Sequence, residues 1–393
     1  MAKVKDIAMQ IRGVSYHPED LHDNLDEDSV VLLRANNIKD GKLILDDVVC
    51  VSKSKVAEQQ YLQTGDILIC ASSGSKELVG KAAFVDSVKN PMTFGAFCKV
   101  VRPQPEYSEY LGHYFNSPVY RRKISALSAG ANINNIKNEH IDNLDIQLVD
   151  EKERREIITI LNKLNMLISL RKQQLAKLDE LIKARFVEMF GDVLLNSMQW
   201  PEKTLERMAD IVSGITKGRK TTETDLQEVP YMAVSNVKDG YIDWTTVKTI
   251  LATKQEIEQY RLMSDDILMT EGGDPDKVGR GAIIKVPLKN SIHQNHIFRV
   301  RLNEQEILPS FFAEYLRHQK AKRYFLGCAK QTTGIASINM RQLRALPTPV
   351  PPLSLQKQFA AFVERVDQQK QTVQQSLDKL ELMKKALMQE YFG

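Results

Sequence analysis

The sequence is poor in cysteine and contains no long apolar run. Its 393 residues include only Cys50, Cys70, Cys98 and Cys328, and no two of them have the close spacing of a zinc site. Four scattered cysteines do not make a disulfide framework, so we interpret them as buried small residues in a reducing compartment. No segment approaches the roughly 18 apolar residues of a membrane span, and residues 1–6 lack the apolar stretch of a secretory signal. These absences predict a cytoplasmic protein.

Signatures of catalysis are also missing. Residues 74–82 superficially resemble a P-loop, but five residues separate its glycines where four are needed, and Ala82 replaces the magnesium-binding hydroxyl residue. His293 and His296 lie three residues apart in a β-rich segment, where they would not share a face, and no third ligand can be identified. The sequence has neither a nucleophile elbow nor a dinucleotide fingerprint. We therefore expect no catalytic, cofactor-binding or metal-binding residue in this chain.

The balance of charge is only mildly basic. The net charge is +4 and the sequence pI is about 8.6, which permits a polyanionic partner without demanding one. With 42% hydrophobic and 26% charged residues, the chain has the composition of a folded protein and is long enough for two or more domains.

The second half of the sequence repeats the first. Val79 and Gly80 return at Val278 and Gly279, and the segment 36–41 returns near 236–240. Ordered matches at a nearly constant spacing indicate a duplicated unit of about 200 residues, and two homologous halves suggest a partner that also has two parts. The clearest matches are Leu178, Lys183, Ala184, Glu188, Phe190 and Gly191, which return 202 residues later at Leu380, Lys385, Ala386, Glu390, Phe392 and Gly393.

Each half combines a strand-rich and loop-rich domain with a long helix. We expect domains at residues 1–150 and 192–350, and helices at 151–191 and 351–393, the second approached through an extended, proline-rich segment. About 37 residues of helix span roughly 55 Å, which is too long for one face of a compact core. Because both halves end in the same kind of helix, we expect the two helices to pair antiparallel as a coiled-coil spacer that buries both seams. The apolar seams are Ile157, Leu161, Leu164, Ile168, Leu175, Leu178, Ile182 and Met189, and Phe359, Val363, Val366, Val373, Leu377, Leu380, Leu387 and Tyr391.

Cations interrupt both seams. Arg171 and Arg185 occupy seam positions of the first helix, and Lys370 and Lys384 occupy those of the second. We expect their charged ends to extend into solvent or to bind acidic groups of another subunit.

Loops rich in Arg, Asn, Ser and Lys are the candidate functional residues. These side chains bind base edges or neutralise phosphates, and Asn can pair with adenine through two hydrogen bonds. Such loops are often only turns, but their recurrence in both halves favours a DNA interface. The first-half candidates are Arg34, Asn36, Asn37, Lys39, Ser72, Ser73, Ser75, Lys76, Lys81, Asn132, Asn134, Asn135 and Lys137. The second-half candidates are Lys217, Arg219, Lys220, Ser235, Asn236, Lys238, Glu271, Arg280, His293, Gln294, Asn295, Gln331, Thr332 and Thr333.

The whole plan resembles the specificity subunit of type I restriction-modification systems, over nearly all 393 residues. The resemblance depends on the proline-rich segment 347–353, the terminal leucine-rich helices and the first-domain segments 34–38, 72–81, 94–98 and 128–136. The first long helix departs from the pattern, because residues 148–154 lack the family's prolines.

This resemblance implies an α+β fold with two mixed α/β target recognition domains separated by two long antiparallel helices, with internal pseudo-two-fold symmetry. It implies a non-catalytic DNA reader for a bipartite asymmetric target, with half-sites about one DNA turn, ~34 Å, apart. The implied partners are double-stranded DNA, two methyltransferase subunits and two restriction/translocase subunits, which bring S-adenosylmethionine, ATP and magnesium. The alternatives are a protein-interaction scaffold with a coiled-coil spacer and an enzyme with an unrecognised site.

Overall fold

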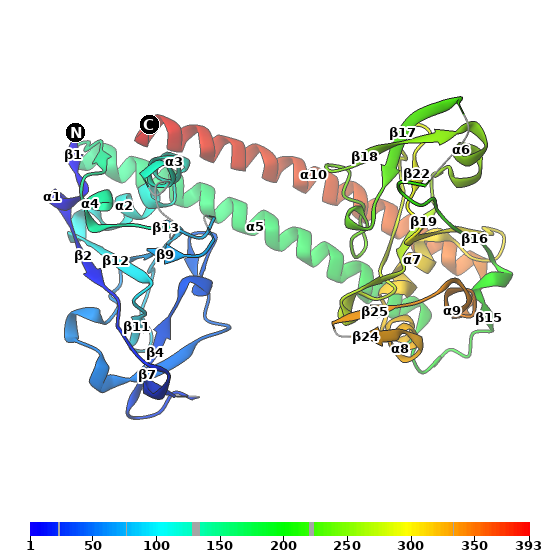
Figure 1. Ribbon diagram of the computed structural model, residues 1–393, viewed down its shortest axis with the longest axis horizontal. Helices are drawn as coiled ribbons and strands as arrows, with labels where there is room; N and C mark the ends of the chain where they lie inside the picture. The colour runs from blue at the N-terminus through cyan, green and yellow to red at the C-terminus, as the bar shows by residue number, and fades with distance from the viewer. Residues whose placement is uncertain (23, 76, 128–133, 220–223, 333) are drawn as a thin grey trace. The chain divides into compact units, whose positions relative to one another are not determined.

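The computed structural model describes residues 1–22, 24–75, 77–127, 134–219, 224–332 and 334–393. It divides into unit 1, Met1–Gln173 with Gln374–Gly393, and unit 2, Gln174–Val373. Each unit contains a mixed domain and one part of each long helix, α5 (Glu151–Phe190) and α10 (Leu353–Phe392) (Figure 1). Both termini of the chain therefore lie in unit 1.

Unit 1 is built on two four-stranded sheets. The first is antiparallel, in the order β10 (Ala82–Phe84), β8 (Ile67–Cys70), β12 (Cys98–Pro103), β2 (Ala8–Arg12). The second has the order β11 (Met92–Phe94), β4 (Ser29–Leu33), β7 (Val49–Ser52), β3 (Leu21–His22). Three two-stranded pairs complete it: β1 (Ala2–Lys3) with β14 (Asp145–Ile146), β5 (Ile38–Lys39) with β6 (Lys42–Leu43), and β9 (Ser72–Ser73) with β13 (Asn134–Asn135). The short helices are α1 (Val4–Ile7), α2 (Ser108–Phe115), α3 (Pro118–Leu127) and α4 (Asn138–Asp142).

Unit 2 repeats this plan. Its four-stranded antiparallel sheet has the order β16 (Ala209–Ser213), β23 (Ile297–Leu302), β19 (Ile267–Thr270), β21 (Gly281–Ile283), which corresponds strand for strand to β2, β12, β8, β10. Two three-stranded sheets follow: β18 (Lys248–Thr253), β17 (Leu226–Met232), β22 (Ile292–His293), and β20 (Gly272–Gly273), β25 (Ile335–Ser337), β24 (Lys330–Thr332). Strand β15 (Glu202–Thr204) pairs with β26 (Pro347–Pro349). The helices are α6 (Lys254–Tyr260), α7 (Pro309–Arg317), α8 (Gln319–Cys328) and α9 (Met340–Arg344).

The main sheet of each unit is held by the same buried ion pair. In unit 1 the Arg102 guanidinium donates to both carboxylate oxygens of Asp66, each at 2.8 Å. In unit 2 Arg301 donates to Asp266 at 2.7 and 2.8 Å. Each carboxylate also accepts a backbone N–H from the residue three places earlier in its own loop. Because these contacts recur at corresponding positions, the sequence repeat is also a structural repeat.

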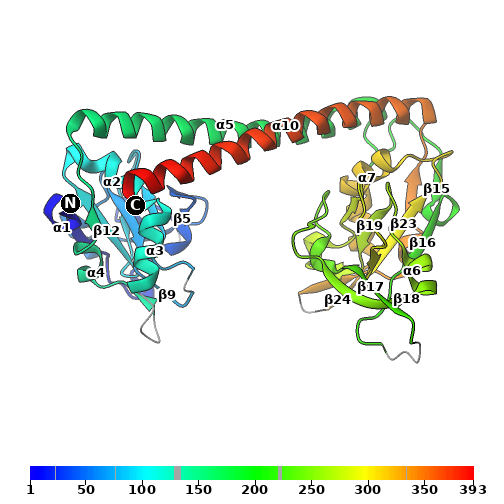
Figure 2. The same ribbon diagram turned by 90° about the horizontal axis from the view of Figure 1, so that it is seen from above.

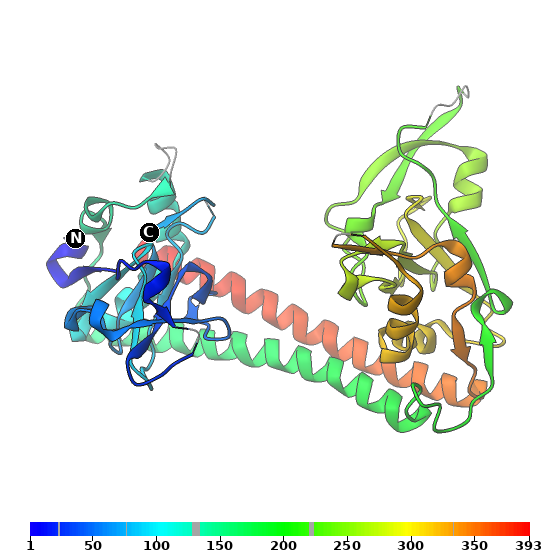
Figure 3. The same ribbon diagram turned by 60° about the horizontal axis from the view of Figure 1, so that its bottom comes forward.

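The two long helices run antiparallel, as the sequence predicts. In unit 1, Ile157 and Leu161 near the start of α5 share a core with Phe392 at the end of α10. In unit 2, Phe186 near the end of α5 packs against Phe359 near the start of α10, with ring centroids 5.5 Å apart. The opposite ends of the helices therefore meet in each unit, and the green and red ribbons lie side by side there in Figures 2 and 3.

The cations in the helix seams correct one expectation. Lys370 binds an acidic group of its own chain and not one of another subunit, because its ammonium group pairs with Asp179 of α5 in the same unit at 2.7 Å. Arg185 pairs with Glu188 at 2.8 Å and lies over the ring of Phe362. Burial lowers the pKa of Lys384, which belongs to the part of α10 in unit 1. Among the described residues, no helix is long and apolar enough to cross a membrane.

Candidate nucleic-acid interface

A short β-ribbon in unit 1 brings two predicted loops together. Strand β9 pairs with β13, so that Ser73 lies opposite Asn134 and Ser72 opposite Asn135. The Ile136 N–H donates to the Ala71 carbonyl at 2.8 Å and fixes the ribbon to the end of β8. The ribbon lies on the side of unit 1 away from its part of α5 (Figure 2). The backbone pairing thus brings Ser72 and Ser73 next to Asn134 and Asn135, from segments about 60 residues apart.

Unit 2 forms the corresponding ribbon with different residues. Strand β20 pairs with β25, which pairs with β24, so that Gly273 and Gln331 both lie opposite Ala336. The Ile338 N–H donates to the Glu271 carbonyl at 2.8 Å, as Ile136 does to Ala71 in unit 1. Two glycines here leave the backbone edge uncovered, whereas unit 1 has two serines at these positions.

One predicted cation stands beside each ribbon. The Cys70 N–H donates to the Lys81 carbonyl at 2.9 Å, and the Thr270 N–H donates to the Arg280 carbonyl at 3.1 Å. Both cations are partly exposed, and the Arg280 Nε is buried with no hydrogen-bond partner among the described residues. Each ribbon therefore has a positive group at its base, where a phosphate could bind.

The predicted DNA contacts of two residues are wrong, because both residues are buried. Asn37 and Asn236 are 1% and 0% exposed. The Asn37 side-chain oxygen accepts the Arg34 N–H, and its amide donates to the Ile44 and Asp47 carbonyls, all at 2.8 Å. These side chains hold their loops in shape and do not face a DNA groove.

The same contacts correct the register of the repeat. Asn236 accepts from the Ala233 N–H at 2.9 Å and donates to the Asp243 carbonyl at 3.0 Å, the pattern that Asn37 makes in unit 1. The partner of Asn236 is therefore Asn37, and the exposed residues Asn36 and Ser235 correspond to each other.

Replacing Asn236 by alanine should lower the free energy of unfolding of unit 2 by about 1–3 kcal/mol, because buried backbone groups lose their partners. Tryptophan fluorescence during urea unfolding measures this effect, since Trp244 lies in the same loop. The neighbouring change Ser235→Ala is the matched control and should alter stability by less than about 0.5 kcal/mol. Equal effects of the two changes would contradict the assigned role of Asn236.

Arg34 and Asn36 are exposed enough to bind DNA but share an acidic neighbour. The Asn36 amide donates to Asp47 at 2.7 Å, and the Arg34 guanidinium lies 3.5 Å from the same carboxylate. Lys39 is exposed on β5, next to a tight turn in which Asp40 and Gly41 both have positive φ. Among the described residues, Arg34, Asn36 and Lys39 make no hydrogen bond to the ribbon of β9 and β13.

The predicted basic loop of unit 2 is partly committed to its own domain. The Arg219 guanidinium binds both carboxylate oxygens of Glu256 in α6 and the Leu251 carbonyl. The predicted DNA contact of Arg219 is therefore wrong, and its role is structural. Hydrogen bonds from Arg219 hold the pKa of Glu256 below its usual value. Lys217 remains exposed nearby.

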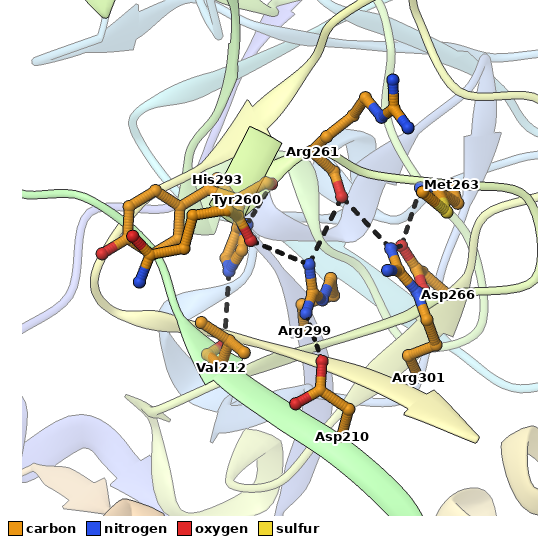
Figure 4. A network of polar contacts seen from close by, with 10 residues as sticks. Asp210, Val212, Tyr260, Arg261, Met263, Asp266, His293, Arg299 and Arg301 are labelled. Carbon is orange, nitrogen blue, oxygen red and sulfur yellow. Dashed lines mark hydrogen bonds and ion pairs between the residues drawn. The ribbon is translucent and has the colours of Figure 1, made fainter. Parts of the chain in front are cut away.

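His293 is also an interior residue. Its ring is fully buried, with Nε2 3.2 Å from the Val212 carbonyl and Nδ1 3.3 Å from the Tyr260 carbonyl (Figure 4). Burial lowers the pKa of His293 to about 4, and the nearby Arg299 acts in the same direction. The neutral ring packs inside unit 2 between the Val212 and Tyr260 carbonyls. The prediction that His293 contacts DNA is therefore wrong.

Of the remaining predicted residues, some are exposed or partly exposed and others lie outside the described residues. Ser75, Asn135 and Lys137 are exposed, and Lys137 lies 3.4 Å from Glu139. Gln294, Asn295 and Lys238 are partly exposed. Lys76, Asn132, Lys220 and Thr333 lie outside the described residues.

Phe97, which the sequence analysis did not select, and His296, which ends the predicted loop 293–296, lie next to the ribbons. The Ser72 N–H donates to the Phe97 carbonyl, and the Glu271 N–H donates to the His296 carbonyl, both at 3.0 Å. The constant spacing between the halves could have paired these positions, but an isolated Phe in a strand-rich segment looks like a core residue. The described residues contain no group of three or more His, Cys, Asp or Glu able to hold a metal ion.

Fold and site together define a duplicated recognition protein, in which one backbone frame presents two different sets of polar side chains. A family model described as "Type I restriction modification DNA specificity domain" matches this sequence twice, at residues 27–180 and 198–382. The chain belongs to this type I restriction-modification DNA specificity family.

Curated relatives cover nearly the whole chain. The chain is 30% identical to the type I restriction enzyme EcoKI specificity subunit of Escherichia coli K12, over 94% of this chain and 81% of the relative. It is 32% identical to the StySPI specificity subunit of Salmonella potsdam, over 93% of this chain and 81% of the relative.

Solved structures show the same fold. A chain from a type I R-M system has a TM-score of 0.56 at 16% identity, covering 99% of this chain and 96% of the other. The type I restriction-modification S subunit of M. genitalium has a TM-score of 0.55 at 15% identity, covering 100% and 95%.

Proposed function

We propose that this chain is the DNA-reading subunit of a type I restriction-modification complex and that each unit reads one half of a bipartite target. The observation that carries the proposal is the recurrence of one ribbon, with different side chains, in both units. Because Ser72 and Ser73 correspond to Gly272 and Gly273, and Ala71 corresponds to Glu271, the two half-sites would differ in sequence. An asymmetric target follows.

The long helices would set the unread gap between the half-sites. Forty residues of α5 span about 60 Å at 1.5 Å per residue, which exceeds the ~34 Å of one DNA turn. A continuous helix without internal Gly or Pro keeps this length constant. The gap would therefore be fixed, while the ribbons would determine the bases.

Catalysis would come from partner subunits. We propose that two methyltransferase subunits and, in the full complex, two restriction/translocase subunits bind this chain and bring S-adenosylmethionine, ATP and magnesium. Exposed apolar residues on one side of α5 in unit 1 support such docking, because an apolar stripe on a surface helix usually packs against another protein. They are Ile160, Met166, Leu167 and Leu170, each 39–55% exposed.

Steep salt dependence is the experimental test of DNA binding. If the chain neutralises about six phosphates, its affinity for duplex DNA should fall roughly 1,000-fold between 50 and 200 mM salt. Lys81→Ala should weaken binding and reduce the logarithmic salt slope by about one, because it removes one phosphate contact. A filter-binding or fluorescence-anisotropy titration at several salt concentrations measures both.

Lys177→Ala on an exposed face of α5 is the matched control and should leave the slope unchanged. Binding that is insensitive to salt would contradict the proposal. Equal loss of slope in both variants would remove Lys81 from the interface but leave DNA binding intact.

A further inference from the structure

Phe97 in unit 1 and His296 in unit 2 occupy the same place in the repeated fold. Each residue is the third of a four-residue turn closed by similar hydrogen bonds, from Cys98 N–H to the Gly95 carbonyl at 2.8 Å and from Ile297 N–H to the Gln294 carbonyl at 2.9 Å. The Phe97 carbonyl accepts the Ala71 N–H at 2.9 Å and the His296 carbonyl accepts the Glu271 N–H at 3.0 Å, so each holds the residue that precedes its ribbon. The backbone is the same in both units, and only the side chains change.

Both side chains are displayed to solvent beside the ribbons. The Phe97 residue is 70% exposed and the His296 side chain 57% exposed, although the strands that begin at the next residue, β12 and β23, are largely buried. Because a phenylalanine at a polar edge gains nothing from packing there, its exposure favours a contact with a ligand.

We infer that Phe97 in unit 1 and the pair of Glu271 and His296 in unit 2 determine sequence preference in the two half-sites, an inference that rests on the proposed function. In unit 1, Phe97 would make an apolar contact with a thymine methyl group in the major groove, next to the Ser72 hydroxyl. In unit 2, Glu271 would accept a hydrogen bond from a cytosine amino group, with His296 as its positioning residue. Thymine preference and cytosine preference would thus arise on one backbone frame.

The contacts of His296 show how the carboxylate is positioned. The ring Nδ1 lies 2.6 Å from Glu271 Oε2, and the Asn295 amide lies 3.4 Å from Nε2. A ring that donates from Nδ1 and accepts at Nε2 satisfies both neighbours. It leaves Glu271 Oε1 without a hydrogen-bond partner among the described residues, so this oxygen can accept from a base.

The test is selection of bound duplexes from a randomised DNA pool by the purified full-length chain, followed by sequencing. Phe97→Ala should remove a thymine preference at one position of one half-site. Glu271→Gln should remove a cytosine preference in the other half-site, and His296→Phe should weaken the preference at that same cytosine position. Each loss should be roughly 5- to 100-fold in discrimination, the range for one base contact.

Controls separate this inference from the proposed function. Met9→Ala removes another exposed apolar side chain of unit 1, on β2, and should leave both half-sites unchanged. If the unmodified chain enriches two half-sites that Phe97→Ala and Glu271→Gln do not alter, the inference is wrong and the proposed function stands. If the unmodified chain enriches no sequence, both are wrong.

Discussion

Replacing Phe186 by alanine is expected to lower the free energy of unfolding of unit 2 by about 3–5 kcal/mol, the usual cost of emptying a buried aromatic site. The ring is 1% exposed and lies where α5, α7 and α10 meet. Its centroid is 5.1 Å from that of Phe190, 5.4 Å from that of Phe311 and 5.5 Å from that of Phe359. The three neighbouring rings cannot move far enough to fill the cavity left by Phe186. Most of the free energy of its packing contacts is therefore not recovered.

The two tryptophans make this measurement specific to one unit. Trp200 and Trp244 both lie in unit 2, so tryptophan fluorescence in a urea titration reports on that unit. Phe392→Ala is the matched control, because its ring packs against Tyr110 and Tyr114 in unit 1. It should destabilise unit 1 by a similar amount, seen by circular dichroism, and leave the tryptophan transition in place. Equal shifts of the tryptophan transition would contradict the division into two units.

Acid should destabilise unit 2 through His293. The pKa of this buried histidine is lowered from 6.5 to about 4, so between these values the unfolded chain binds a proton that the folded chain does not. Stability is therefore retained above about pH 6.5 and is lost as the pH falls toward 4. The expected loss from this group is about 3 kcal/mol, at about 1.4 kcal/mol per pKa unit.

Unit 1 supplies the control variant for this effect. The Ile215 N–H donates to the His293 carbonyl as the Val14 N–H donates to the Phe94 carbonyl, so phenylalanine occupies this place in unit 1. His293→Phe should flatten the dependence of unit 2 stability on pH between 6.5 and 4, measured by tryptophan-detected urea unfolding at several pH values. A variant with the slope of the unmodified chain would show that another group is responsible.

Features set by local spacing could be predicted from the sequence. An apolar seam at alternating steps of three and four residues, without Gly or Pro, determines a long helix regardless of its surroundings. The pattern predicts helices at 151–191 and 351–393, and α5 and α10 run from Glu151 to Phe190 and from Leu353 to Phe392. The repeat likewise predicts two similar α+β domains, and the fold class is confirmed.

The site was harder because burial depends on distant contacts. Asn36 and Asn37 are chemically identical neighbours, and Asn37 is buried because its side chain binds the Arg34 N–H and the carbonyls of Ile44 and Asp47. The ribbon pairs segments about 60 residues apart, which loop composition cannot reveal. Phe97 was overlooked because apolar residues in strand-rich segments are usually core, and its exposure is visible only in the fold.

The most direct test of the central claim is to map methylated adenines by single-molecule sequencing in a genome that encodes this chain with its partner subunits. We expect one motif made of two different short blocks separated by an unread gap of constant length. A motif in a single continuous block, or no adenine methylation that depends on this chain, would contradict the account.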